Sequence, residues 1–248
     1  MSKSNFSNVI EGSDGDQFAQ HSTQRLGHGQ EMRFPDGRRF RYARAGAVAV
    51  VPGKLYQAAI PVTNHVLQTA AAAAVGDRTV TLAIGGTAAT ADQYRDGYLV
   101  VDLASNTGFG YIYQIGAHEA QAASSDFIVP LRSSVQVAID ATANSVSLVP
   151  NNYAGVILSV VATPTACCAG VSVRAIPIGE FGWIQVAGNV PCLTVGTLVI
   201  GTTIIPGTTT GAVIAESTAA SLTLPVLGYV NRVAVTTAYS TITLTGLE

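Results

Sequence analysis

The sequence contains few charged side chains. Only 11% of its 248 residues are Asp, Glu, Lys or Arg, whereas 48% are hydrophobic; about a quarter charged is usual for a soluble domain. The formal net charge of −2 argues against a general nucleic-acid binder, because such proteins carry an excess of basic residues. A surface made mainly of Ala, Thr, Ser and Gly has few charges to repel other molecules and so resists association only weakly. We therefore expect much of it to be covered by identical copies or by another protein.

Long apolar runs are missing as well. Gly, Pro or Thr interrupts the apolar stretches before they reach the about 18 residues that a membrane helix needs. The first thirty residues are polar and lack the cationic start and apolar block of a secretory signal. We therefore expect no membrane partner, and a bacterial surface adhesin is a weak alternative for the same reason.

Cysteine pairs, metal-ligand spacings and catalytic motifs are scarce. The three cysteines are Cys167, Cys168 and Cys192; an adjacent pair and an odd count predict reduced, structural thiols rather than disulfides. The four histidines are scattered without spaced Cys/His pairs, so we predict no metal site and no cofactor. The sequence contains no nucleophile elbow, zinc-protease motif or phosphate loop. We predict that the chain is not an enzyme and has no catalytic residues.

Two features support an alternative hypothesis. Asp92, Asp96 and Asp102 lie close in the sequence, and paired carboxylates can cleave glycosidic bonds, although Asp96 with the glycine after it is typical of a turn. The single tryptophan, Trp183, could form a sugar platform, although a core anchor is the more common role. The alternative is a head-fibre or tail appendage that binds or cleaves host glycans, with Trp183, Tyr94 and Asp96 at its site.

The pattern after residue 46 predicts strand after strand. Short segments rich in Val, Ile, Thr and aromatic residues are each closed by Gly, Pro, Asn or Asp. This pattern is typical of an all-β fold, with sandwich or barrel domains. Two alanine-rich segments, 68–76 and 119–125, fit either a helix or a strand. The predicted strands include 47–53, 54–62, 78–86, 96–104, 126–131, 134–140, 170–179, 181–188 and 240–246.

Composition along the chain predicts three parts. Residues 1–32 contain few apolar side chains, too few to fold alone, and we expect an extended polar arm. Residues 33–150 form a first β-domain that begins with a basic hairpin. Residues 151–248 form a second β-domain, sandwich or barrel, in which charged residues become rare and Thr becomes frequent.

The basic hairpin holds five arginines in the segment "EMRFPDGRRFRYARAG", residues 31–46. The Pro-Asp-Gly sequence at 35–37 predicts the turn. Strand alternation places Phe40 and Tyr42 on one face and Arg39 and Arg41 on the other. Guanidinium groups form forked bonds with carboxylates, so we predict an acidic protein partner rather than a nucleic acid. The predicted contact residues are Arg33, Arg38, Arg39, Arg41 and Arg44.

Several loose motifs from residue 33 onward carry a family resemblance. They are "PDGRRFRYARAG", "VTLAIGGTAATADQYRDGYLVV", "GFGYIYQIGAH", "VSLVPNNYAGVI", "GEFGWIQVAG" and "LGYVNRVAVTTAYSTITLTGL". Together they resemble the capsid decoration, or cement, proteins of tailed bacteriophages. The resemblance implies an all-β structural virion protein, often a homotrimer, that is assembled in the host cytoplasm and lies on the outer surface of the capsid. There it bridges major capsid protein subunits and stabilises the shell. The expected mechanism is that the arm and the hairpin contact capsid carboxylates, so that many weak contacts break together.

Overall fold

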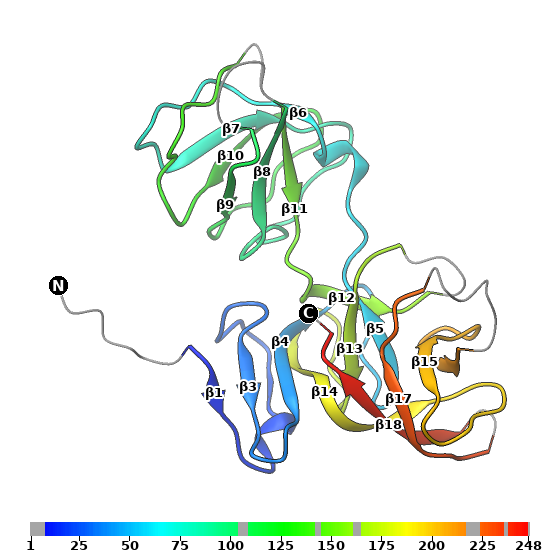
Figure 1. Cartoon of the computed structure of the whole chain (residues 1–248). Coiled ribbons are helices and arrows are strands. Elements are labelled where there is room, and N and C mark those ends of the chain that lie inside the picture. Colours follow the sequence, from blue (N-terminus) through cyan, green and yellow to red (C-terminus); the bar gives the residue numbers. More distant parts are fainter. Residues whose placement is uncertain are drawn as a thin grey trace. The chain divides into compact units, whose positions relative to one another are not determined.

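The computed structural model describes residues 8–103, 109–141, 145–160, 165–216, 224–235 and 238–247. Within these ranges the only helical elements are two short 3-10 turns, η1 (Asp16–Phe18) and η2 (Thr63–His65). Strands and their connections form the rest (Figure 1). The predicted all-β fold class is confirmed.

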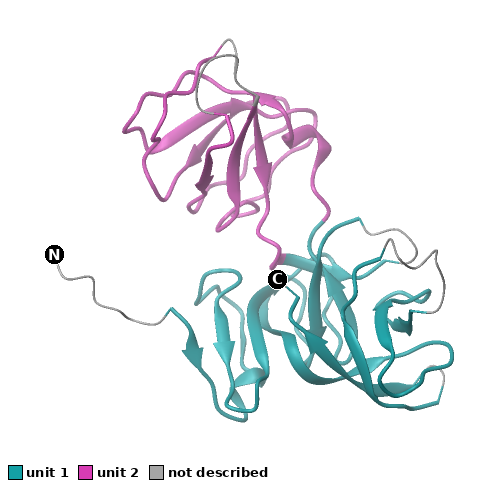
Figure 2. Ribbon diagram, in the orientation of Figure 1, with its two compact units in different colours: residues 1–59, 155–248 teal, residues 60–154 magenta. Residues whose placement is uncertain are grey.

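The chain forms two compact units, unit 1 with residues 1–59 and 155–248 and unit 2 with residues 60–154 (Figure 2). This division differs from the contiguous domains 33–150 and 151–248 that the sequence predicted. One boundary lies where composition changes, but residues 33–59 belong with the C-terminal half. The reason is hydrogen bonding across a large sequence separation, which local composition does not record. Unit 2 is therefore an insertion within unit 1.

Unit 1 contains a ring of five strands. Strand β4 pairs with β12, β12 with β5, β5 with β13, β13 with β14, and β14 returns to β4. We call this the first ring, and it closes as a small barrel does, without a free edge. Its strands are β4 (Arg39–Ala45), β5 (Leu55–Gln57), β12 (Ala154–Leu158), β13 (Cys168–Ser172) and β14 (Phe181–Leu193).

Strand β14 is long enough to enter a second ring. Its C-terminal half pairs with β18, which pairs with β17; β15 pairs with both β17 and β16. A parallel bridge between Thr194 and Val213 links β16 back to the end of β14. In Figure 1, β14 (yellow) runs beside β18 (red). The other strands of this second ring are β15 (Thr203–Pro206), β16 (Val213–Ala215), β17 (Gly228–Arg232) and β18 (Tyr239–Thr245).

The described part of the predicted arm, residues 8–32, belongs to the sheet of unit 1. Strand β1 (Ile10–Glu11) runs parallel to β3 (Glu31–Arg33), and β2 (Gln20–His21) pairs with β14. Apolar side chains of this segment cover an aromatic core cluster, which explains why it is not an extended arm. The cluster consists of Met32, Phe34, Phe40, Tyr42, Phe181 and Trp183, with Ile10, Ala19, Leu26 and Val173 packed against it. Residues 1–7 of the predicted arm lie outside the described residues.

Unit 2 is a separate small barrel. Its strands pair in the order β6, β11, β8, β9, and β10 pairs with β7. A bridge between Ile115 and Leu131 joins β9 to β10, and a bridge between Ala70 and Leu82 joins β6 to β7, so that the pairing closes. Alternate side chains point inward and fill a core of its own. The strands are β6 (Gln68–Thr69), β7 (Thr79–Ala83), β8 (Tyr98–Leu103), β9 (Ile112–Gln114), β10 (Asp126–Pro130) and β11 (Ser145–Val149).

Several segments are less regular than the predicted or open elements, and the predicted strands 54–62 and 170–179 are shortened to β5 and the end of β13. The predicted strands 47–53 and 134–140 contain only isolated bridges, at Val50 and Ile139. The alanine-rich segments 68–76 and 119–125 contain no helix, and only the two-residue β6 and isolated bridges in place of a longer strand. Alanine has the highest helix propensity, but tertiary contacts override this weak preference, and the barrel supplies hydrogen-bond partners that hold the chain extended at single positions.

Candidate interaction site

The arginine-rich segment forms the predicted hairpin between β3 and β4. Met32 pairs with Phe40 across it, and the turn closes with a 2.9 Å bond from the backbone N–H of Phe34 to the carbonyl of Arg38. Phe40 and Tyr42 are buried on one face, whereas Arg39 and Arg41 on the other face are half-buried. The predicted alternation is confirmed.

Glu31 is the centre of an ion-pair cluster on this hairpin. Its side chain is only 10% exposed; it accepts a hydrogen bond from Arg33 and lies 3.2 Å from Arg41. Burial raises the pKa of Glu31, but the bond from Arg33 and the charges of Arg41, Arg33 and Arg39 outweigh burial, so the pKa lies below its ordinary value. The carboxylate therefore stabilises the packing of β3 on β4 in its charged form.

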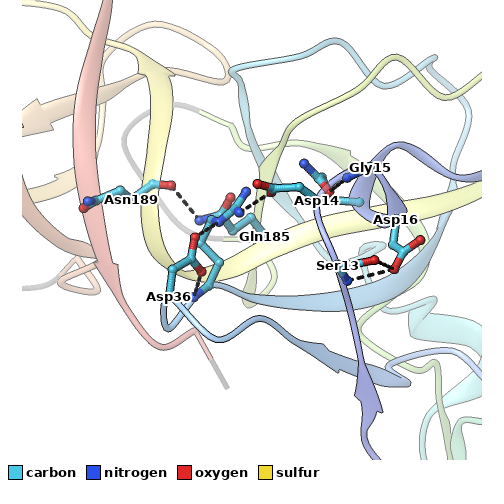
Figure 3. A network of polar contacts seen from close by, with 9 residues as sticks. Ser13, Asp14, Gly15, Asp16, Asp36, Gln185 and Asn189 are labelled. Atoms are coloured by element: carbon cyan, nitrogen blue, oxygen red, sulfur yellow. Dashed lines mark hydrogen bonds and ion pairs between the residues drawn. The ribbon is translucent and has the colours of Figure 1, made fainter.

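Arg38 is held by two carboxylates. Its Nε lies 2.6 Å from Asp36 and its Nη2 lies 2.6 Å from Asp14, which comes from the N-terminal segment (Figure 3). The guanidinium also lies 4.6 Å from the centre of the Phe34 ring, a favourable cation–π distance. A backbone bond from Arg38 and its charged side chain lower the pKa of Asp36, against a smaller opposing effect of burial. Arg38 thus fastens residue 14 onto the hairpin turn.

The remaining two arginines also contact their own chain. Arg44 donates a 3.2 Å bond to the carbonyl of Gly179 and lies 5.9 Å from the centre of the Phe181 ring. Arg39 packs beside Gly246, where a Cβ atom would stand only 2.7 Å from a guanidinium nitrogen. All five predicted contact arginines therefore have intramolecular neighbours, and Arg33, with a side chain 52% exposed, reaches furthest into solvent.

Sequence reasoning missed the acidic half of this cluster. Glu31 and Asp14 were not singled out, although Glu31 lies two residues before Arg33, a spacing that places both side chains on one face of a strand. That spacing was the available signal for Glu31. Asp14 gave none, because its pairing depends on where the N-terminal segment packs.

The residues of the predicted sugar site are buried and lie in different units. Trp183 is 4% exposed in unit 1, while Tyr94 and Asp96 are 0% and 2% exposed in unit 2. Trp183 is a core anchor, as the commoner role predicts. Each of the three side chains is therefore covered by its own unit and is not displayed to a sugar.

The three clustered aspartates have separate structural partners. Asp92 lies 3.2 Å from Arg95, Asp96 pairs with Arg132, and Asp102 accepts a 2.5 Å bond from Ser147. Asp96 occupies the predicted turn with a φ of 63°, a left-handed conformation that Asp tolerates better than most residues. Each carboxylate is used in holding a loop or a strand.

Two buried histidines of unit 2 are tied to Tyr94. The Tyr94 hydroxyl lies 2.5 Å from Nδ1 of His65, and the Tyr94 backbone N–H donates to Nε2 of His118 at 3.0 Å. The other ring nitrogens bond the carbonyls of Thr87 and Glu119. Burial raises the pKa of Tyr94, so the phenol stays protonated. This network joins three loops and is structural.

The three cysteines are unpaired and differ in exposure. Cys167 is exposed, Cys168 is half-buried and Cys192 is buried. Burial raises the pKa of Cys168 to about 11, with a further rise from Cys167, and raises the pKa of Cys192 to about 12. Two of the three thiols are therefore poor nucleophiles.

Within the described ranges, no group of three or more His, Cys, Asp or Glu could hold a metal ion. No helix in the part of the chain that the structure covers is long and apolar enough to cross a membrane. The outer face of unit 2, in contrast, displays apolar side chains: Ile112 pairs with Val100, and Tyr98 pairs with Val149. Tyr98, Ile112 and Val149 are 38%, 56% and 39% exposed. We call these four residues the apolar barrel face.

No family model, curated protein or solved structure matches this chain.

Proposed function

We propose that this chain is a structural protein of a tailed-bacteriophage virion that adheres to the outer surface of the head. In this proposal it bridges major capsid protein subunits and stabilises the shell without catalysis. The apolar barrel face is the observation that carries the proposal, because contiguous apolar side chains on an exposed sheet face are suited to contact with another protein. The charge-poor composition and the family resemblance of the sequence support it.

The barrel of unit 2 supports a contact made through side chains. Among its described residues, ladders and bridges pair each strand with a neighbour on both sides, which leaves little strand edge for a partner strand to extend. Adhesion through unit 2 would therefore use side chains, and Tyr98 and Ile112 of the apolar barrel face would be the largest contacts. Many copies bound to one shell would together form many weak contacts. Separating two capsid subunits would then require all the contacts that bridge them to break at the same time.

The arginine hairpin has a changed role in this proposal. Arg38 and Arg41 are occupied by Asp14, Asp36 and Glu31. They would hold the N-terminal segment in place, and the half-exposed Arg33 would be the arginine that reaches capsid carboxylates. Raised salt should then weaken head attachment only modestly, since exposed ion pairs contribute little.

The test uses heads assembled without the protein. Purified wild-type chain should co-sediment with these heads and appear as regular density on their outer surface by electron cryo-microscopy. Ile112→Asp should lower occupancy at least about tenfold, because a carboxylate would be buried against apolar surface. Val199→Asp is the matched control, since Val199 is 60% exposed but lies in unit 1. Heads that bind no wild-type chain, or bind both variants equally well, would refute the proposal.

A further inference from the structure

The two units carry net charges of opposite sign. Unit 2 contains seven acidic residues and three arginines, a net charge of −4, whereas unit 1 contains eight acidic and ten basic residues, a net charge of +2. The two values add up to the −2 of the whole chain. Charge is therefore separated along the sequence even though the total is near neutral, and like units of two copies would repel each other weakly while unlike units attract.

Unit 2 has a hollow of about 390 Å³ in which acidic and apolar side chains meet. Glu119 and Asp126 line it and form no ion pair with any described residue. Ile128, 62% exposed, and Pro130 supply its apolar wall. Asp126 and Ile128 alternate on β10, so both project outward, while Phe127 between them is buried. We call this site the acidic hollow; it is separate from the residues of the apolar barrel face.

Unit 1 has a surface of complementary character. Val48 and Ile178 are 50% and 63% exposed. They lie on two segments that run antiparallel, joined by a bridge from Val50 to Ile176 and by a 3.1 Å bond from the N–H of Gly179 to the carbonyl of Ala45.

The same two segments carry two arginines, Arg44 four residues before Val48 and Arg174 four residues before Ile178. The side chain of Arg44 donates to the carbonyl of Gly179, and the side chain of Arg174 donates to the carbonyl of Phe18. Neither guanidinium forms an ion pair with a described carboxylate. Phe18 itself is 47% exposed. We call Val48, Ile178, Arg44, Arg174 and Phe18 the basic patch.

We infer that the acidic hollow of one copy binds the basic patch of a second copy of this chain. Arg44 or Arg174 would enter the hollow and pair with Glu119 and Asp126, and Ile178 would cover Ile128. Such a contact joins two different surfaces of the chain. Two copies could exchange it reciprocally in a dimer, or each copy could bind the next in a ring or an open chain. Pairing of the two carboxylates with an arginine gives the contact its specificity, because a surface without a complementary charge would leave the carboxylates unpaired.

A charge swap tests this inference without phage heads. Glu119→Lys with Asp126→Lys should weaken self-association of the purified chain at least about a hundredfold in sedimentation equilibrium, because like charges would face each other. Arg44→Glu with Arg174→Glu should do the same. The chain that carries all four substitutions should associate again, because the charges are complementary in the reverse sense. Glu216→Lys, an acid reversal on unit 1 outside the basic patch, is the matched control and should leave association unchanged.

Two outcomes overturn the inference: a wild-type chain that is monomeric at about 100 µM, or a four-fold variant that folds but does not associate. If the four-fold variant does not fold, wild-type association in rising salt decides instead. Association should weaken steadily as salt screens the charges, and salt-independent association would refute the contact. Ile112→Asp separates this inference from the proposed function, since it should lower head binding and leave self-association intact.

Discussion

Replacing Glu31 by Gln should destabilise unit 1 far more than its single lost charge would at an exposed site. The Glu31 carboxylate is 10% exposed and contacts both Arg33 and Arg41. A hydrogen bond to a charged group contributes about 1.5–3 kcal/mol. Gln keeps one acceptor oxygen and loses the charge. Because the Arg33 side chain is half-exposed, we expect the free energy of unfolding to fall by about 2 kcal/mol.

Thermal unfolding of the whole chain measures this loss. For a unit of this size, 1 kcal/mol shifts the midpoint by about 2–4 °C, so Glu31→Gln should lower the midpoint of unit 1 by about 4–8 °C. Asp14→Asn is the matched control: it removes the same kind of charge from an arginine pair, but Asp14 is 83% exposed. Its cost should stay below about 0.5 kcal/mol.

A double-mutant cycle with Arg41→Gln locates the interaction. If the carboxylate acts through Arg41, the two substitutions together should cost less than the sum of their separate costs. Equal destabilisation by Glu31→Gln and Asp14→Asn would refute the reasoning, because burial of the carboxylate would then have no energetic consequence.

Three further predictions follow from the same structure. The pKa of Glu31 in the folded chain lies below its ordinary 4.5, so its contribution to the stability of unit 1 is complete above that pH and is lost as pH falls below it. The free energy of unfolding should therefore fall less steeply with acid in Glu31→Gln than in the wild type, and identical pH dependence would contradict this. In the native protein a thiol reagent should modify Cys167 rapidly and Cys168 and Cys192 slowly, and all three should react after denaturation. Mass spectrometry counts the adducts, and rapid modification of native Cys192 would contradict the buried position of its side chain. Replacing residues 60–154 by two glycines should leave unit 1 folded, because the insertion begins and ends beside the paired strands β5 and β12. A thermal melt followed by circular dichroism should show a cooperative transition, and its absence would contradict the prediction.

The sequence predicted the features that depend on local periodicity and turn chemistry. The Phe40/Arg41 alternation and the Pro-Asp-Gly turn were sufficient for the hairpin, since a strand has a period of two and the turn residues preset its backbone angles. The same local rules identified most of the strands. They failed at 47–53, where an apolar alternating pattern forms one bridge, at Val50, because a strand also needs a neighbour along its length.

The features that were not predicted depend on contacts between distant residues. Strand β5 pairs with β12 about a hundred residues later, so the insertion has no local signal. The arginines were correctly placed together, but their partners were not found, since Asp14 reaches Arg38 only after the N-terminal segment has packed on the aromatic core. The acidic hollow combines Glu119 with residues of β10, which the sequence treated as separate segments.

The sharing of β14 by the two rings of unit 1 has a consequence for how this unit opens. Its first half is hydrogen-bonded to β4 and β13, and its second half to β18. Neither ring can lose this strand without breaking the wall of the other, so partial melting of one ring is costly. Amide hydrogens of β14 should be the last of unit 1 to exchange with solvent deuterium, and should exchange together, as one cooperative block.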